Sequence, residues 1–316
     1  MKNAMMLACL LMLAGCATMP PMPGQRVSVG DRALHLYCSG PESTSPTVII
    51  EGGLSGISPF YARIQQALEP QVRTCTYDRA GFGWSDPSDS PRDAQHIATE
   101  LRMLLQGANV KPPYVLAGHS LGGLIAMRYQ HEFPQEVAGL VFVDSSYRGQ
   151  YWDEKRLMKP YKLGKISAAV GFTYLYNPMR VWLEPLPAKQ QEDLLYFSRQ
   201  ADFYRTTMAE IEDLNESSAQ AAETKTLNSL PVVAITAGKK CKNGPKTTDE
   251  QRLKCAKSAD EWTKHHAKLA GLSVRGRHIV FPDATHLSLV TEGDYAEKVA
   301  ASIMSVVEEA RKQVDE

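Results

Sequence analysis

Residues 118–123 read Gly-His-Ser-Leu-Gly-Gly, between the apolar runs 114–117 (Tyr-Val-Leu-Ala) and 124–127 (Leu-Ile-Ala-Met). This is the pattern Gly-x-Ser-x-Gly at a junction between a strand and a helix. We expect Ser120 on a sharp turn with strained backbone, where Gly118 and Gly122 let the strand and the helix approach closely. The turn lifts the hydroxyl above the sheet edge, and the following helix points its amides toward it. The pattern predicts a nucleophilic serine at position 120.

Strand and helix signals alternate along the rest of the chain. Strands are predicted at 27–29, 33–38, 47–50, 74–77, 114–117, 140–143, 231–236 and 278–281, and helices at 61–68, 93–106, 121–133 and 292–312. This alternation predicts an α/β fold, a doubly wound and mostly parallel sheet with right-handed crossovers. Residues 145–228 contain helical patches rich in aromatic residues and no strand signal. Because structureless loops of that length are uncommon, we predict an inserted helical cap there, with a core of 26–144 and 229–316.

The composition is that of an ordinary globular protein. Of the 316 residues, 43% are hydrophobic, which is enough for a full core. The 35 basic residues equal the 35 acidic ones, and no basic run occurs, so we expect no nucleic-acid partner. No Cys-x-x-Cys spacing for zinc is present, and we expect neither a metal nor a cofactor. The sequence does not indicate an oligomeric state.

The N-terminus has the pattern of a processing segment. Residues 1–15 contain Lys2 and an apolar stretch too short to span a bilayer, which predicts a secretory signal peptide. The sequence Leu-Ala-Gly-Cys that ends at Cys16 resembles the bacterial lipobox, whose cysteine becomes the acylated first residue of the mature protein. This resemblance implies a lipid anchor on Cys16 in the bacterial cell envelope, facing the periplasm or the exterior. Ala17 resembles the outer-membrane sorting pattern of Gram-negative bacteria, and the proline-rich residues 16–25 predict an extended tether.

Export changes the expected chemistry of the cysteines. Besides those in the signal and Cys16, four cysteines remain, an even number in an oxidising compartment. Cys241 and Cys255 bracket a polar segment that a disulfide would fasten. Cys38 and Cys75 each fall in a predicted strand and can be bridged only if those strands are neighbours.

Three motifs together resemble the α/β-hydrolase superfamily, over residues 25 to the C-terminal helix. They are the serine motif 118–123, residues 77–86 (Tyr-Asp-Arg-Ala-Gly-Phe-Gly-Trp-Ser-Asp) and residues 282–286 (Pro-Asp-Ala-Thr-His). The second resembles the loop after the fourth strand in the branch with esterases, peptidases and dehalogenase-like enzymes. The resemblance implies an inserted cap and a strand order that places the second strand beside the fourth. That order would make Cys38 and Cys75 neighbours.

The resemblance also implies a catalytic triad in the order serine, acid, histidine. His286 follows the last predicted strand and precedes the final helix, at the same sheet edge as Ser120, and is expected to be the general base. His119 belongs to the serine turn, and we expect its side chain to point elsewhere. His265 and His266 lie in a polar helical stretch and are expected to be solvated.

The acid departs from the pattern of most relatives, in which an aspartate follows the seventh strand. Here no carboxylate occurs after 231–236 until Asp249. Some relatives take the acid from the end of the sixth strand, where this chain has Asp144, which could also merely cap a turn. We favour Asp144, with Asp249 as the alternative and Glu250 and Asp153 behind it.

An oxyanion hole needs two backbone amides directed at the developing charge. Leu121 follows the nucleophile and is expected to supply one. Residues 51–56 (Glu-Gly-Gly-Leu-Ser-Gly) resemble the His-Gly-x segment of the family with the histidine replaced, which implies Leu54 for the second amide, with Gly53 as the alternative.

The leading hypothesis is a lipid-anchored serine hydrolase that cleaves a small to medium carboxylic ester through an acyl-enzyme on Ser120. A serine excludes the aspartate chemistry of dehalogenases and most epoxide hydrolases. An aminopeptidase or amidase and a carbon–carbon hydrolase share the serine triad and stay open. A non-catalytic envelope lipoprotein that uses the fold to bind a ligand is the alternative of a different class.

Overall fold

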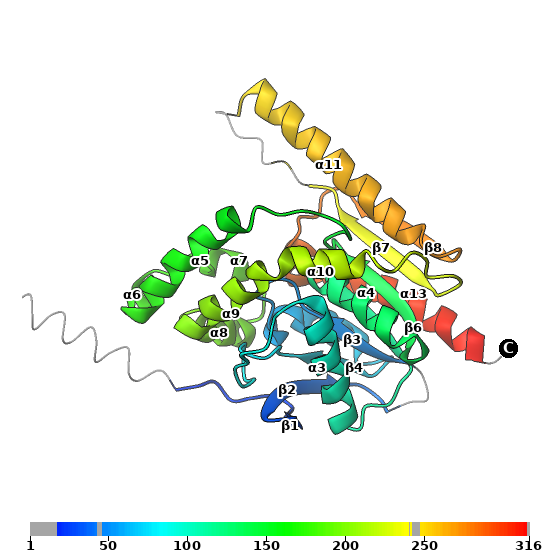
Figure 1. Ribbon diagram of the computed structural model, residues 1–316, viewed down its shortest axis with the longest axis horizontal. Helices are drawn as coiled ribbons and strands as arrows, with labels where there is room; N and C mark the ends of the chain where they lie inside the picture. The colour runs from blue at the N-terminus through cyan, green and yellow to red at the C-terminus, as the bar shows by residue number, and fades with distance from the viewer. Residues whose placement is uncertain (1–17, 43–45, 240, 242–246, 315–316) are drawn as a thin grey trace, which may run out of the picture.

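A computed structural model describes residues 18–42, 46–239, 241 and 247–314. Its strands form one sheet in the order β1-β2-β4-β3-β5-β6-β7-β8 (Figure 1). The strands are β1 (Gln25–Val29), β2 (Arg32–Ser39), β3 (Thr47–Glu51), β4 (Thr74–Tyr77), β5 (Tyr114–His119), β6 (Val137–Val143), β7 (Val232–Ala237) and β8 (Gly276–Phe281). The pairs β1–β2 and β2–β4 are antiparallel, and the other neighbours are parallel. The predicted α/β fold with a mostly parallel sheet is confirmed.

Helices cover both faces of this sheet (Figure 1). Around the strands lie the short 3₁₀ helices η2 (Ser58–Tyr61) and η3 (Pro134–Glu136), and the α-helices α2 (Ala62–Leu68), α3 (Ala94–Gly107), α4 (Gly122–Glu132), α11 (Asp249–Ala270), α12 (Ser288–Thr291) and α13 (Gly293–Val314). Six helices join β6 to β7: α5 (Glu154–Ala169), α6 (Phe172–Leu175), α7 (Arg180–Leu183), α8 (Ala188–Phe197), α9 (Ala201–Glu212) and α10 (Leu214–Ala221). They occupy residues 145–228, called the cap segment below. Its limits as a separate unit stay a prediction.

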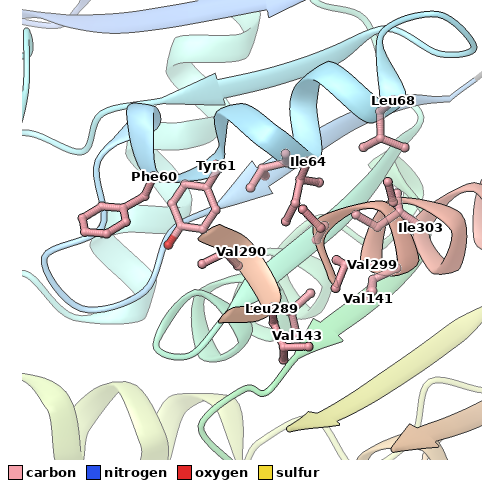
Figure 2. Close-up of a cluster of buried hydrophobic side chains, with 14 of the residues drawn as sticks. Phe60, Tyr61, Ile64, Leu68, Val141, Val143, Leu289, Val290, Val299 and Ile303 are labelled. Carbon is pink, nitrogen blue, oxygen red and sulfur yellow. The ribbon is translucent and has the colours of Figure 1, made fainter. Parts of the chain in front are cut away.

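The central strands are buried on both faces, and their side chains alternate between two cores. In β6, Val141 and Val143 belong to the core under α2, α12 and α13, whereas Leu140 and Phe142 belong to the core under α3 and α4. Figure 2 shows the first core, in which side chains of α2 and α13 pack together on the same side of β6: Ile64, Leu68, Val299 and Ile303. Because both faces of such a strand are buried under helices, its sequence is a nearly continuous run of apolar residues.

The N-terminal predictions lie outside the described residues. These are the signal peptide at 1–15 and the acylated Cys16, together with the first part of the tether 16–25. Among the helices that the described residues form, none is both long and apolar enough to cross a membrane.

The structure contains both disulfides. Cys38 of β2 and Cys75 of β4 are directly opposite in the antiparallel pair and are bonded. The strand neighbourhood that the resemblance implied is therefore confirmed. Cys241, after β7, is bonded to Cys255 in α11. The first bridge closes a loop between residues 37 positions apart, and the second between residues 14 positions apart.

We expect that replacing Cys38 and Cys75 with alanine lowers the free energy of unfolding by about 2–4 kcal/mol, because the unfolded chain regains the freedom of a long loop. Denaturant titration of wild type and variant measures the change. Cys241→Ala with Cys255→Ala opens a shorter loop and is the matched control, with a smaller expected loss. A double variant at 38 and 75 as stable as the wild type contradicts the prediction.

Candidate active site

Ser120 occupies the tight turn between β5 and α4. Its φ is 54°, in the left-handed region that non-glycine residues rarely adopt. Glycine is needed on both sides of Ser120 because neighbouring backbone atoms lie too close to leave room for a Cβ. A Cβ at Gly118 would lie 2.5 Å from the Gly122 carbonyl oxygen, and one at Gly122 would lie 2.3 Å from the carbonyl oxygen of Glu51. The backbone therefore presents Ser120 at the end of β5, as the motif predicts.

Asp144 and His286 are brought together at the same sheet edge. Asp144 directly follows β6, is fully buried and accepts a hydrogen bond of 2.7 Å from Nδ1 of His286. Its other carboxylate oxygen accepts from the Ala237 amide at 3.0 Å and from the Trp262 indole at 2.8 Å. Three donors satisfy this buried carboxylate and fix the plane of the imidazole. The His286 side chain itself is 39% exposed.

The alternative acids lie elsewhere. Asp249 opens α11 with a fully exposed side chain and is 3.9 Å from Arg252. Glu250 is also exposed, and Asp153 caps the start of α5 by accepting from the Arg156 amide. Of the carboxylates considered from the sequence, the structure brings only Asp144 to His286 among the described residues.

Ser120 and His286 line one cavity of about 240 Å³. The rest of its lining is largely apolar and aromatic and includes Leu54, Phe60, Tyr161, Leu287 and Val290. Among the hydrogen bonds of the described residues, none joins the Ser120 hydroxyl to the His286 ring; such contacts often tighten only when substrate binds. No group of three His, Cys, Asp or Glu side chains in the described part of the chain is arranged to hold a metal ion.

His119 and His266 differ from the sequence expectation. The His119 ring lines the same cavity, lies 4.5 Å from the His286 ring between centroids, and its Nε2 is 3.2 Å from the His286 carbonyl oxygen. His266 is not solvated: it is 1% exposed and bonds through its ring nitrogens to Thr236 and to the Ser145 carbonyl. His265 stacks on the ring of Tyr147, with centroids 3.5 Å apart. The apolar positions on one side of α11 are too few for the sequence pattern to predict that His266 is buried.

Tyr61 connects the serine turn to the neighbouring loop. Burial raises the pKa of Tyr61 to about 12, so its hydroxyl stays protonated at neutral pH. The hydroxyl oxygen accepts from the Gly53 amide at 2.7 Å, and the hydroxyl can donate to Nδ1 of His119 at 3.2 Å. With Nδ1 of His119 as acceptor, its Nε2 carries the proton that reaches the His286 carbonyl. A continuous chain of hydrogen bonds thus runs from Gly53 to the backbone of His286.

The amide assignments of the predicted oxyanion hole can now be compared. The Gly53 amide already donates to Tyr61, which makes it a poor candidate for a substrate oxygen. Within the described residues, no recorded hydrogen bond uses the amide of Leu54 or of Leu121. Leu54 lines the cavity, and Leu121 directly follows Ser120, which also lines it. The geometry therefore favours Leu54 over Gly53.

A buried arginine holds the loop 52–56 in place. Arg79 is 1% exposed; its Nη1 donates to the Gly52 carbonyl at 2.8 Å and its Nη2 to the Gly53 carbonyl at 2.6 Å. It also pairs with Glu51 at 2.9 Å and with Glu210 at 2.6 Å. Burial opposes the charge of Arg79, but the carboxylates of Glu210 and Glu51 outweigh it, so the pKa of Arg79 lies above its usual value.

The second partner of Arg79 comes from the cap segment. Glu210 lies on α9, is fully buried, and also accepts from the Ser55 amide at 3.2 Å. One turn earlier on α9, Thr207 bonds to the Ser55 hydroxyl at 2.8 Å. The loop that carries the candidate amide of Leu54 is therefore held by Arg79, which follows β4, and by two side chains of α9.

Sequence reasoning missed three residues of this site. Trp262 is a lone aromatic in a polar stretch, and Glu210 resembles any surface glutamate of a helix. Neither gives a local signal, because their partners lie more than 100 positions away. Arg79 stands inside the quoted motif 77–86, which could have singled it out.

Replacing Arg79 with alanine should lower the free energy of unfolding by about 3–5 kcal/mol, because two buried carboxylates and two carbonyls lose their donor. Denaturant unfolding measures this. Arg26→Ala is the matched control: it removes the ion pair with Asp86, in which both side chains are more than 40% exposed, and should cost about 1 kcal/mol or less. Equal losses in the two variants would mean that the Arg79 cluster is no more important than a surface pair.

Comparison with known proteins places the chain in a family. The sequence profile described as alpha/beta hydrolase fold matches residues 46–225, more than half of the chain. An uncharacterized protein from Schizosaccharomyces pombe is 28% identical over 274 residues, which cover 73% of this chain and 49% of that protein. The chain spans about half the length, or less, of the curated relatives it matches.

Solved structures share the architecture. A thermophilic esterase from Thermogutta terrifontis has a TM-score of 0.64 and 16% identity, covering 90% of this chain and 98% of that one. An epoxide hydrolase mutant from Vigna radiata has a TM-score of 0.66 and 16% identity, with the same coverage of both chains. At such identities the likeness shows the fold alone. The family profile, the sheet order and the serine turn agree, and the chain belongs to the alpha/beta hydrolase fold family.

Proposed function

We propose that this protein is a serine hydrolase that cleaves small to medium carboxylic esters through an acyl-enzyme on Ser120. The observation that carries the proposal is the hydrogen bond between the buried Asp144 carboxylate and Nδ1 of His286, beside a cavity that Ser120 also lines. A carboxylate, an imidazole and a hydroxyl at one sheet edge have the chemistry of a catalytic triad.

In this mechanism His286 is the general base. Its Nδ1 carries the proton donated to Asp144, so Nε2 holds the lone pair that takes the Ser120 proton. The serine oxygen attacks the ester carbonyl, and a tetrahedral intermediate forms. His286 then returns the proton to the leaving alcohol as the ester C–O bond breaks, and the acyl group stays on Ser120. A water molecule that gives its proton to His286 attacks this acyl group, and His286 returns the proton to the Ser120 oxygen as the carboxylic acid is released. Asp144 stays ionised throughout and stabilises the imidazolium, supported by Ala237 and Trp262.

The amides of Leu121 and Leu54 are proposed to bind the oxyanion. Each such donor contributes about 100-fold to 1000-fold in rate when it is preorganised. Arg79 and Glu210 supply the preorganisation on the Leu54 side, because they fix the carbonyls and the amide of the adjoining loop residues.

The cavity favours a substrate of limited size. A volume of about 240 Å³, with Leu54, Phe60 and Val290 among the walls, suits a short acyl chain or a single aromatic ring. Tyr161 of α5 is the cap residue in this lining, and burial raises the pKa of its hydroxyl, which therefore stays neutral at physiological pH.

Ser120→Ala and Asp144→Asn should each lower kcat/KM for p-nitrophenyl esters by about 1000-fold or more, because the nucleophile is lost or the imidazole loses its orientation. A series of acyl chain lengths, measured with each variant, gives these values. Asp249→Asn is the matched control and should stay within about two-fold of wild type, since its side chain is exposed.

A fluorophosphonate probe gives a second readout. It should label the wild type covalently and fail to label Ser120→Ala. A folded wild-type protein that neither reacts with the probe nor hydrolyses any ester of the series would instead be the non-catalytic binding module. A collapse of activity in Asp249→Asn, with Asp144→Asn unaffected, would contradict the assignment of the acid.

We also propose that the protein is anchored by a lipid on Cys16 in a bacterial cell envelope, facing the periplasm or the exterior. The lipobox-like sequence that ends at Cys16 supports this. The disulfides Cys38–Cys75 and Cys241–Cys255 support it as well, because structural disulfides persist in oxidising compartments.

Expression in a Gram-negative host with an alkyne-bearing fatty acid tests the anchor. The wild type should incorporate the label and fractionate with membranes, because acylation on one cysteine with several chains holds a protein stably on a bilayer. Cys16→Ser should lose the label. Labelling that survives Cys16→Ser would contradict the assignment of this residue.

A further inference from the structure

Exposed apolar side chains concentrate at one end of the cap segment. Of the 15 large hydrophobic residues that are exposed among the described residues, nine lie within residues 151–182. The most exposed include Leu163 at 66%, Ile166 at 63%, Leu175 at 66% and Val181 at 71%. Single exposed hydrophobic residues are ordinary, but a gathering of this kind marks an interaction surface. Residues 155–182, which comprise α5 without Glu154, all of α6, and α7 without Leu183, are called the cap tip.

The cap tip also has a one-sided charge. It contains six basic residues and no acidic one, although the chain as a whole is neutral: Lys155, Arg156, Lys159, Lys162, Lys165 and Arg180. All six are exposed, and within the described residues none of them forms an ion pair. Positive charge beside apolar side chains is the combination that binds an anionic lipid surface.

Helix α5 arranges the two kinds of residue on one face. Its spacing places Lys155, Lys159 and Lys162 on the same side as Leu163, Ile166 and Val170, with the lysines in the first half and the apolar residues in the second. The opposite side packs on α9, where a Cβ at Gly164 would lie 2.2 Å from the Tyr204 ring. The exposed face is therefore fixed by the packing of the helix.

The start of the described chain lies against the cap segment. Met19 lines a hollow together with Tyr196, Phe197 and Phe203 of helices α8 and α9. The adjacent Pro20 carbonyl accepts from the Trp84 indole at 3.0 Å. Cys16 is three residues before Met19, and three residues span at most about 11 Å. An acyl group on Cys16 would thus hold a bilayer on the side of the cap helices.

We propose that the cap tip docks onto an anionic lipid bilayer, with Leu163, Ile166 and Leu175 entering the interface and the lysines contacting the headgroups. A second copy of the chain fits the surface less well, because six positive charges would face six positive charges. The proposal does not depend on hydrolysis. It also needs no acyl chain on Cys16, which would add to the binding.

Binding to vesicles tests the proposal. The protein is the chain from residue 16 with Cys16→Ser, so that neither an acyl chain nor the apolar stretch of residues 1–15 contributes, and the vesicles are phosphatidylcholine with or without phosphatidylglycerol. Ile166→Glu with Leu175→Glu should lower partition into the anionic vesicles about 10-fold or more, because two apolar side chains no longer enter the interface. Lys159→Glu with Lys162→Glu should have a similar effect that weakens as salt is raised.

The matched control is Leu253→Glu with Val274→Glu. These residues are 73% and 86% exposed, lie outside the cap tip and add the same two charges. The control should bind within about two-fold of the parent, and circular dichroism verifies that all variants fold. Equal binding of the cap-tip variant and the control would overturn the proposal, as would equal binding to neutral and anionic vesicles. If a cap-tip variant binds vesicles as well as its parent does but loses a dimer that the parent forms in sedimentation, the surface binds a second copy of the chain instead.

Discussion

The buried guanidinium of Arg79 is the contact on which the rest of the arrangement depends. It bonds to two carbonyls of the loop after β3 and pairs with one carboxylate from the sheet and one from α9. Taking three charges out of water is costly, and the cost is offset only when all the partners are in place. The sheet, the loop that flanks Ser120 and the cap segment are consequently held in one geometry. A change in any of the three leaves a charge or a carbonyl without its partner.

Helix α5 connects the proposed hydrolysis with the proposed docking of the cap tip. One side of the helix carries Tyr161, which lines the cavity beside Ser120, and the other side carries the apolar residues of the cap tip. Its neighbour α9 carries Glu210, the partner of Arg79. A bilayer that holds the exposed side of α5 would therefore act on the wall of the cavity through a single rigid element. In the proposed docking, surface binding would reach the cavity through Tyr161, which lies on the same helix as the docking residues.

Features whose signal lies within a few neighbouring residues could be predicted from the sequence, and contacts between distant residues could not. The turn at Ser120 and the alternating strands carry their signals within a few residues, and these were confirmed. The pair Cys38–Cys75 needed the strand order, which only the resemblance supplied. Asp144 was reached because no carboxylate directly follows β7. Contacts such as Trp262 with Asp144 join residues 118 positions apart, and no short motif encodes them. The burial of His266 was missed because it depends on which side of α11 meets the sheet.

The left-handed backbone at Ser120 and at Asp144, with φ values of 54° and 43°, also limits what these positions can become over evolutionary time. Threonine keeps the hydroxyl of serine, yet its branched β-carbon fits poorly at positive φ. Asparagine and aspartate tolerate that conformation better. Descendants of this chain could therefore exchange a hydroxyl for a carboxylate at position 120 more easily than one hydroxyl side chain for another. Among those descendants, the backbone conformation at these positions, more than the reactivity of the side chain, would determine which mutations persist.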